Sequence, residues 1–345
     1  MDGWRAVADE GHAHAYFNLA TMFRDGMGVP QGIVEAARWF DLAANHGDSQ
    51  AQYELGVMYD SGRGVTQSHV EAARWYREAA DQGVQEAQFN LGLMYKNGTG
   101  VQQSDEEAVR WFKKAALQGS AEAQQSLGIM LKKGTGVVQS DVEAVHWFRE
   151  AANRGNVLSQ FSLARMFHLG RGVAQNNAEA ARWYQRAADQ GFAEAQYYLG
   201  SMYDEGQGVA QCYVKAVRWL KKAADQGVAR AQFHMGIMVA KGRGMVKSDT
   251  EVMRWFLKAA EQGIAMAQYN VGFNYMNGIG IAKNYTEAAK WCKMAADQGF
   301  NEAQYLLGVL FEGGLGVAQS NSKAFRWYKS AASQGNAMAR QRLGM

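Results

Sequence analysis

The residues best suited to metal or redox chemistry are the seven histidines and two cysteines, and their spacing does not form a site. Only His12 and His14 stand close enough together to hold a metal ion, and then weakly. No cysteine or carboxylate cluster with ligand spacing joins them, so we expect no metal site and no cofactor. Cys212 and Cys292 fall at different points of the repeating pattern described below, so we expect no disulfide between them.

Glycine pairs such as Gly98 and Gly100 are a second chemical signal, because glycine-rich loops can cradle phosphate groups. Here the pair follows a predicted helix and lacks the strand–turn–helix setting of a phosphate loop. No G-x-S-x-G, H-E-x-x-H or Cys/His pairing stands out in the chain. We therefore predict that the protein is not an enzyme.

A basic residue recurs beside the regularly spaced tryptophans, as Arg38, Arg74, Arg110, Arg182, Arg218, Arg254, Lys290 and Arg326. Nucleic-acid binding would need such a stripe together with aromatic stacking platforms. The neighbouring aromatic residues are instead expected in the core, and Glu35, Glu71 and Glu107 lie three residues before Arg38, Arg74 and Arg110 as ion-pair partners. With a net charge of only +3, we expect no nucleic-acid partner.

These residues are positioned by a pattern that returns every 36 residues. The tryptophans show it best, at Trp39, Trp75, Trp111, Trp147, Trp183, Trp219, Trp255, Trp291 and Trp327. The glycine pairs keep the same spacing, from Gly26/Gly28 to Gly314/Gly316. A fixed period of this size indicates stacked supersecondary units.

Each copy contains two predicted helices, which we call its first and second helix. In the copy 85–119 the first helix is expected over 86–97, because Ala87, Leu91 and Met94 follow helical spacing. Gly98 then stands where a helix ends in the left-handed region. With one proline in the chain and no sustained alternation of polar and apolar residues, we predict an all-α protein without strands.

The second helix is expected to begin at a capping box, Ser104 and Glu107, in which each side chain caps a backbone N–H of the other residue. Related boxes are Ser68/Glu71, Ser140/Glu143, Ser248/Glu251, Asn176/Glu179 and Asn284/Glu287. The aromatic pair Trp111 and Phe112 should fill the space between helices, and every tryptophan of the series, including Trp147, should be buried. Stacking of neighbouring units then builds one continuous core.

At these residues the sequence resembles the Sel1-like repeat, a relative of the tetratricopeptide repeat. The matching residues of one copy are Ala51-Gln52-Tyr53, Leu55-Gly56, Met58-Tyr59, Gly62-Arg63-Gly64-Val65, Glu71-Ala72-Ala73-Arg74-Trp75-Tyr76, Ala79-Ala80 and Gln82-Gly83. The resemblance implies a right-handed α-solenoid of antiparallel helix pairs that serves as a protein-interaction scaffold. Departures at Gln125-Ser126, Ala164-Arg165 and Cys212/Lys215 are expected to loosen local packing slightly.

We predict one elongated array over residues 1–345, with nine full copies over 13–336. Residues 1–12 read as the end of a preceding second helix, and 337–345 as a lone first helix acting as a cap. Either these half-units are the caps, or the chain is a section of a longer protein. No signal peptide is visible and no apolar run approaches the roughly 18 residues of a membrane span, so we expect a cytoplasmic protein without membrane insertion.

The first helices vary between copies at four places on one face, those of Glu86, Asn90, Leu93 and Asn97. The resemblance implies that this face lines a concave groove, in which an asparagine can bond a peptide backbone. The predicted partner-binding residues are Asn18, Glu54, Asn90, Asn97, Tyr198, His234, Asn270 and Phe273. The place of Leu93 is often apolar and we favour a core role there; the alternative is an apolar patch of Phe273, Tyr198 and Met276 for a partner helix.

The predicted function is thus a non-catalytic scaffold that binds a peptide or protein segment in this groove. One rival is a structural array that associates end to end. Another is an enzyme, since some cysteine-rich relatives are discussed as β-lactam binders. The lack of a cysteine pair in each repeat and of a Ser/Lys motif argues against an enzyme, whereas a deep pocket with polar groups from neighbouring repeats would favour it.

Overall fold

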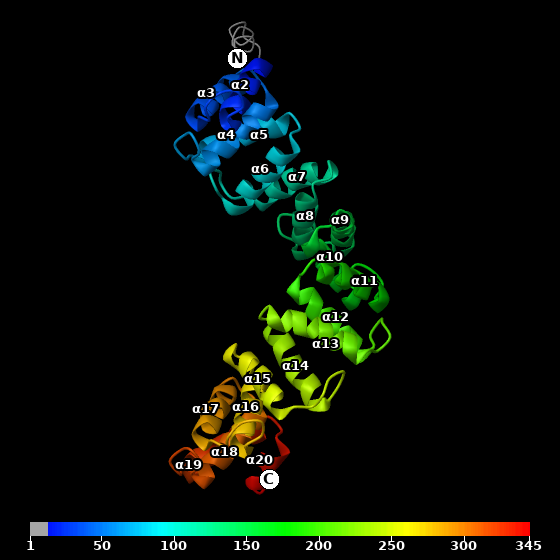
Figure 1. The fold of residues 1–345 in the computed structure, drawn as a ribbon, viewed down its shortest axis with the longest axis vertical. Helices are drawn as coiled ribbons and strands as arrows, with labels where there is room; N and C mark the ends of the chain where they lie inside the picture. The colour runs from blue at the N-terminus through cyan, green and yellow to red at the C-terminus, as the bar shows by residue number, and fades with distance from the viewer. Residues whose placement is uncertain (1–12) are drawn as a thin grey trace. The chain divides into compact units, whose positions relative to one another are not determined.

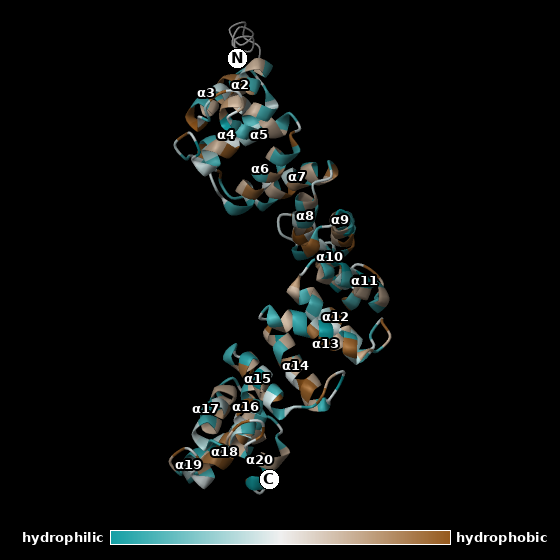
Figure 2. Ribbon diagram, in the orientation of Figure 1, coloured by the Kyte–Doolittle hydropathy of each residue, from teal (hydrophilic) through white to brown (hydrophobic). Residues whose placement is uncertain are grey.

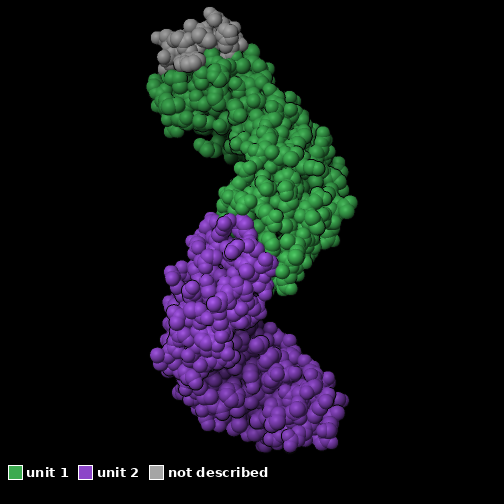
Figure 3. All heavy atoms as spheres, turned by 90° about the vertical axis from the view of Figure 1, so that its right-hand side faces the viewer, with its two compact units in different colours: residues 1–175 green, residues 176–345 purple. Residues whose placement is uncertain are grey.

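The computed structural model describes residues 13–345, and over that range it contains helices and turns without a strand, as predicted. The expectation of a helix in residues 1–12 lies outside the described residues. The chain separates into two compact units, residues 1–175 and 176–345, which Figure 3 colours green and purple. Each unit is described by itself, and a single domain over all nine repeats stays a prediction.

Unit 1 is a stack of helices in which each first helix packs on the second helix of its own repeat and on that of the repeat before (Figure 1). Its first helices are α2 (Ala13–Asp25), α4 (Ser49–Ser61), α6 (Gln85–Asn97), α8 (Ala121–Lys133) and α10 (Val157–Leu169). Its second helices are α3 (Ile33–Asn45), α5 (His69–Asp81), α7 (Asp105–Leu117) and α9 (Asp141–Asn153). The predicted helix over 86–97 is therefore correct to one residue.

Unit 2 repeats the arrangement. Its first helices are α12 (Ala193–Glu205), α14 (Ala229–Lys241), α16 (Ala265–Asn277), α18 (Asn301–Gly313) and the short α20 (Ala337–Arg342). Its second helices are α11 (Asn177–Asp189), α13 (Tyr213–Asp225), α15 (Asp249–Glu261), α17 (Tyr285–Asp297) and α19 (Asn321–Ser333). Polar and apolar residues mix within single helices in Figure 2, as expected where one stripe of each helix faces a core.

Both glycines of the G-x-G pair have a structural role. Gly98 ends α6 in the left-handed region with φ 69°, as predicted. Gly100 also has a positive φ, and a side chain there would collide with the carbonyl oxygen of His69 at the start of α5. The second glycine therefore lets the loop of one repeat lie directly on the second helix of the repeat before it.

Only half of the predicted capping box forms. Ser104 Oγ accepts a hydrogen bond from the Glu107 backbone N–H at 3.2 Å, as expected. The Ser104 N–H donates to the carbonyl of Tyr95 at 3.0 Å, which takes the place of the reciprocal bond. The Glu107 carboxylate instead accepts from Arg110 at 3.4 Å, because the helix places residues three apart on the same side. Cys212 makes no side-chain cap, in line with its departure from the pattern.

The tryptophans join successive repeats. Trp111 of α7 is 3% exposed and packs in one cluster with Ala72 and Tyr76 of α5 and Leu91 of α6. Phe112 lies on Gly92 of its own repeat, where a Cβ would come 2.7 Å from the ring. Burial of every tryptophan was too broad an expectation: Trp39, Trp147 and Trp327 are only half-buried.

A glutamine bridge also ties neighbouring repeats. Gln88 of α6 is buried and donates to the carbonyl of Ala80 at 3.0 Å. Gln118, which follows the second helix of the same repeat, donates to Gln88 Oε1 at 2.8 Å and to the carbonyl of Gly83, in the repeat before, at 2.9 Å. The bridge satisfies polar groups that burial would otherwise leave unpaired. The same amide-to-amide bond recurs in Gln82–Gln52, Gln226–Gln196, Gln262–Gln232, Gln298–Gln268 and Gln334–Gln304.

Two repeats of unit 1 lack the bridge. In the repeat 13–48, Tyr16 and His46 stand at the places of the two glutamines; the other is the repeat 121–156. Arg154 occupies the place of the bridging glutamine, and the buried Gln124 Oε1 has no hydrogen-bond partner. The Arg154 guanidinium lies against Gly119 instead. The junction with the repeat before thus keeps the hydrogen bond from Gln124 Nε2 to the carbonyl of Ala116 at 3.0 Å, but leaves the buried Gln124 Oε1 unpaired.

Candidate peptide-binding surface

The predicted partner-binding residues lie on the first helices, whose variable side we call the first-helix face. Six of the predicted residues occupy the same position, the sixth residue of a first helix, and all six are half-buried: Asn18, Glu54, Asn90, Tyr198, His234 and Asn270. In three cases this residue, or its counterpart in α20, forms an ion pair with the preceding first helix: Arg24–Glu54 at 2.9 Å, Asp204–His234 at 3.0 Å and Glu312–Arg342 at 3.2 Å. Part of the predicted surface is therefore used to join repeats.

Asn90 occupies a different setting, between two tyrosines of the preceding repeat. Burial raises the pKa of the Tyr53 hydroxyl, as do the Glu54 and Glu86 carboxylates, while a hydrogen bond with the Asn90 side chain acts in the opposite direction. The pKa of Tyr76 is likewise raised by burial and opposed by a bond with Asn90. The Asn90 amide thus lies beside both phenol groups.

A cavity of about 410 Å³ opens on the first-helix face at Asn90. Its lining comes from three successive first helices and one loop, as Tyr53, Gln85, Glu86, Phe89, Asn90, Gly119, Ser120, Ala121 and Glu122. The volume lies within the range of sites for small ligands. We call it the Asn90 cavity; it has aromatic sides, two carboxylates and no basic lining residue.

In unit 2 the matching face is closed by side chains of the chain itself. Asp204 of α12 is 7% exposed and bonds His234 at 3.0 Å and Arg243 at 3.2 Å. Arg230, the second residue of α14, bonds Glu194 of α12 at 2.7 Å. Its guanidinium also lies 5.1 Å from the centre of the Tyr197 ring.

Tyr198 belongs to this closed group. Its ring stacks on Tyr184 with centres 5.3 Å apart and lies 5.7 Å from the Arg230 guanidinium. Burial raises the pKa of the neighbouring Tyr197, and the positive charge of Arg230 opposes that rise. Of the predicted residues, the structure thus brings Tyr198 and His234 to one place, and neither belongs to the Asn90 cavity.

The remaining predicted residues are scattered. Asn97 is exposed at the end of α6, and Asn18 is half-buried in α2. Asn270 donates to the carbonyl of Met266 in its own helix at 2.7 Å, so its amide is partly engaged. Phe273 is 37% exposed, which excludes a core role for its ring, and α14 lies between its helix and that of Tyr198.

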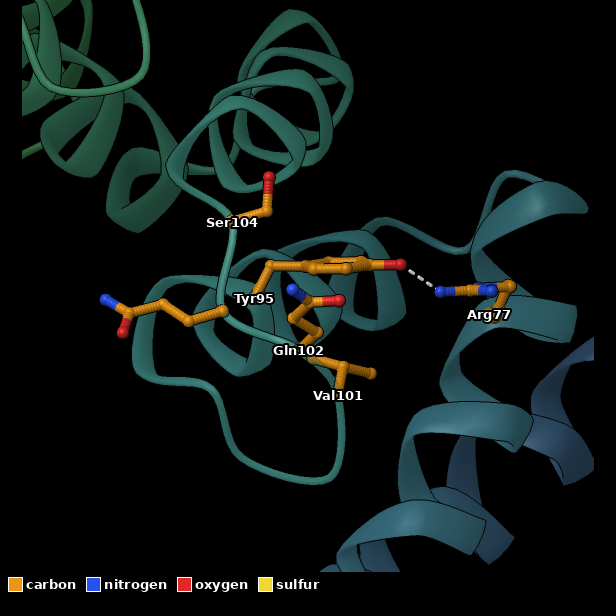
Figure 4. A pocket seen from close by; sticks show the side chains of 6 residues that line it. Arg77, Tyr95, Val101, Gln102 and Ser104 are labelled. Carbon is orange, nitrogen blue, oxygen red and sulfur yellow. Dashed lines mark hydrogen bonds between the residues drawn. The ribbon is translucent and has the colours of Figure 1, made fainter.

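A second cavity, of about 590 Å³, lies between α5 and the loop that follows α6. Figure 4 shows Arg77 and Tyr95 pointing toward one another, joined by a hydrogen bond to the tyrosine hydroxyl, with Val101 and Gln102 on the loop beside them. An equivalent cavity in unit 2 is lined by Gln185, Tyr203 and Val209, which stand three repeats further on. This cavity therefore follows from the repeat architecture. Because it recurs in another repeat, it does not mark a binding site for one particular ligand.

Five of the eight basic residues beside the tryptophans form the expected solvated ion pairs: Arg74, Arg110, Arg182, Arg254 and Lys290. The expected pair of Glu35 with Arg38 does not form within residues 13–345. Arg74 bonds Glu71 at 3.0 Å, and Arg182 bonds Glu179 at 2.6 Å. Within residues 13–345 no group of three metal-binding side chains forms and no helix is long and apolar enough to cross a membrane. His12 lies outside the described residues, and His14 is exposed in α2.

Sequence reasoning missed Arg230, Asp204 and the glutamine bridge. The bridge had a visible signal, since glutamines recur at the same two places of nearly every copy. Asp204 and Arg230 had none: only Asp60 repeats the aspartate at the place of Asp204, and no other copy has an arginine at the place of Arg230, so neither place shows a pattern. Their partners become visible only when α12 and α14 are packed side by side.

Comparison with known proteins identifies the pattern. The sequence model of the family described as Sel1 repeat matches nine consecutive segments: 13–48, 49–84, 85–120, 121–156, 157–192, 193–228, 229–264, 265–300 and 301–336. The chain belongs to the Sel1 repeat family. Repeat scaffolds of this family generally mediate protein–protein interaction and are generally non-catalytic.

Two solved Sel1 repeat structures are similar over most of the chain. A Sel1 repeat protein from Oxalobacter formigenes is 33% identical with a TM-score of 0.70, and the match covers 89% of both chains. The antigen c5321 of uropathogenic Escherichia coli, described as displaying an SLR fold, is 33% identical with a TM-score of 0.63 over 99% of this chain and 81% of its own. Both support the predicted all-α solenoid. A comparison with curated proteins gives no match.

Proposed function

We propose that this Sel1 repeat protein is a non-catalytic scaffold that binds an extended segment of a partner protein on the first-helix face of unit 1. The observation that carries the proposal is the Asn90 cavity, which contains a predicted binding residue and is lined by three successive repeats. A segment that crosses α4, α6 and α8 can present its backbone to the Asn90 amide and one side chain to the cavity.

The cavity has polar groups from neighbouring repeats, the feature that would favour an enzyme, so its chemistry matters. Ser120 is its one lining hydroxyl apart from Tyr53. That hydroxyl accepts from the Ala123 N–H at 3.2 Å as a helix cap, and contacts Glu122 at 3.3 Å. No histidine or lysine lines the cavity to activate it, which favours binding over catalysis.

A peptide selection tests the proposal. A random peptide library displayed on phage is selected on the immobilised 345-residue chain, and affinities of synthetic peptides are measured by calorimetry. We expect Asn90→Lys to weaken binding at least tenfold, because the longer charged side chain enters the cavity. Asn153→Lys is the control with the same substitution, since Asn153 is exposed at the end of the second helix α9 and does not line that cavity.

Far-UV circular dichroism checks that both variants keep their helical signal. If no peptide is selected, or if Asn90→Lys binds as well as the parent chain, the proposal is wrong. End-to-end association and a cytoplasmic location stay predictions; light scattering over a concentration series tests the first.

A further inference from the structure

Resting on the proposed function, we infer that the Asn90 cavity receives a guanidinium or ammonium side chain of the partner, held between Glu86 and Glu122 over the Phe89 ring. Residues at the same repeat positions in unit 2 show which chemical group this geometry accepts.

Unit 2 contains the filled form of the same geometry. Three repeats after Glu86, Phe89 and Asn90 stand Glu194, Tyr197 and Tyr198. There the Arg230 guanidinium bonds Glu194 at 2.7 Å and lies over both tyrosine rings, 5.1 and 5.7 Å from their centres. This fold therefore accepts a cation between successive first helices, where a carboxylate bonds it and aromatic rings lie against it.

Unit 1 keeps the carboxylate, as Glu86, and one of the two aromatic rings, as Phe89, but has Asn90 in place of Tyr198 and no cation. Glu122 occupies the repeat position of Arg230, so unit 1 has a second carboxylate where unit 2 has the guanidinium-bearing side chain. Glu86 and Glu122 are both exposed, and neither has an ion-pair partner within residues 13–345. Glu54, by contrast, is already paired with Arg24. The cavity thus offers two uncompensated negative charges.

A glutamate in the first turn of a helix also stabilises that helix, as Glu302 does in α18, so the carboxylates alone do not define a cation site. Arg154 lies against Gly119 at the rim, but it forms no ion pair with either glutamate within the described residues. The aromatic lining of Tyr53 and Phe89 is what turns two exposed carboxylates into a cation site.

The test builds the missing cation into the chain. Glu122→Arg should reproduce the Arg230 arrangement, with the new guanidinium bonding Glu86, and a crystal structure of the variant shows directly whether it does. Filling the cavity from within should weaken the phage-selected peptides at least tenfold. Glu302→Arg, the same change at the same place of α18, should leave their affinity unchanged.

The peptides provide the second measurement. We expect a lysine or arginine in those that bind at the cavity, and at least a tenfold loss when that residue is replaced by glutamine. If selected peptides lose affinity in Asn90→Lys but have no basic residue, the cation inference is overturned and the proposed function stands. If the Glu122→Arg side chain points away from Glu86 and binding persists, the inference is also wrong; if no peptide binds the chain, both fail.

Discussion

Helices α6 and α8 of unit 1 and helices α12 and α14 of unit 2 have the same lengths and the same place in their repeats, yet their first-helix faces differ in charge. In unit 2 an arginine at the second residue of α14 fills the space against α12. In unit 1 a glutamate at the equivalent residue of α8 leaves a cavity. In a repeat protein one residue can therefore convert an internal contact into a surface available to a partner, because the backbone around it stays the same.

The largest test asks whether the two units also differ in their cores. Trp255 of unit 2 is 2% exposed, whereas Trp147, three repeats earlier, is half-buried. We expect Trp255→Ala to cost about 3–5 kcal/mol, as for other buried aromatic residues, and Trp147→Ala to cost less than about 3 kcal/mol because less apolar area is lost. Urea unfolding followed by circular dichroism measures both; equal losses would mean that the half-buried ring contributes as much as the buried one.

A second test concerns the charged closure of unit 2. Asp204→Ala removes the shared acceptor of His234 and Arg243, and we expect a loss of about 1.5–3 kcal/mol, the usual range for hydrogen bonds to a charged group. Lys96 stands at the equivalent place of α6 and is exposed, so Lys96→Ala should change stability by less than about 0.5 kcal/mol. Similar thermal midpoints for the two variants would show that the closure contributes nothing.

The smallest expected effect is an increase in the free energy of unfolding. In unit 2 Gln262 donates to Gln232 at 2.7 Å. The equivalent residues of unit 1 are Arg154 and Gln124, whose side-chain oxygen Oε1 has no hydrogen-bond partner. Arg154→Gln should supply the missing donor and raise the free energy of unfolding by about 0.5–1.5 kcal/mol. The same urea titration measures it, with Arg149→Gln on the exposed side of α9 as the control; no gain would mean that the Gln124 amide is already satisfied by water.

The helices were predictable because each depends on residues close together in the sequence, and the same pattern recurs in nine repeats. The limits of α6 followed from Gly98 and from apolar spacing, and the partners of Arg74 and Arg110 followed from positions three residues apart on a helix. The second half of the capping box was not predictable, since the Ser104 N–H is satisfied by Tyr95, whose carbonyl is brought close by the turn between the helices.

The candidate site was predictable only as a face. The helical period put Asn90 and Tyr198 on equivalent sides of their helices, but it could not show that one borders a cavity and the other stacks under Arg230. That difference arises between residues about thirty positions apart, such as Asp204 with His234, whose distance is set by how neighbouring helices pack.

The sequence by itself determined the 36-residue unit, its two helices and the all-α stacking, because helix formation and capping depend on residues within a few positions of one another. The tertiary structure alone decided which carboxylates are paired, which tryptophans are buried and where a cavity remains. Those outcomes depend on side chains from successive repeats competing for the same space, which no single copy of the pattern contains.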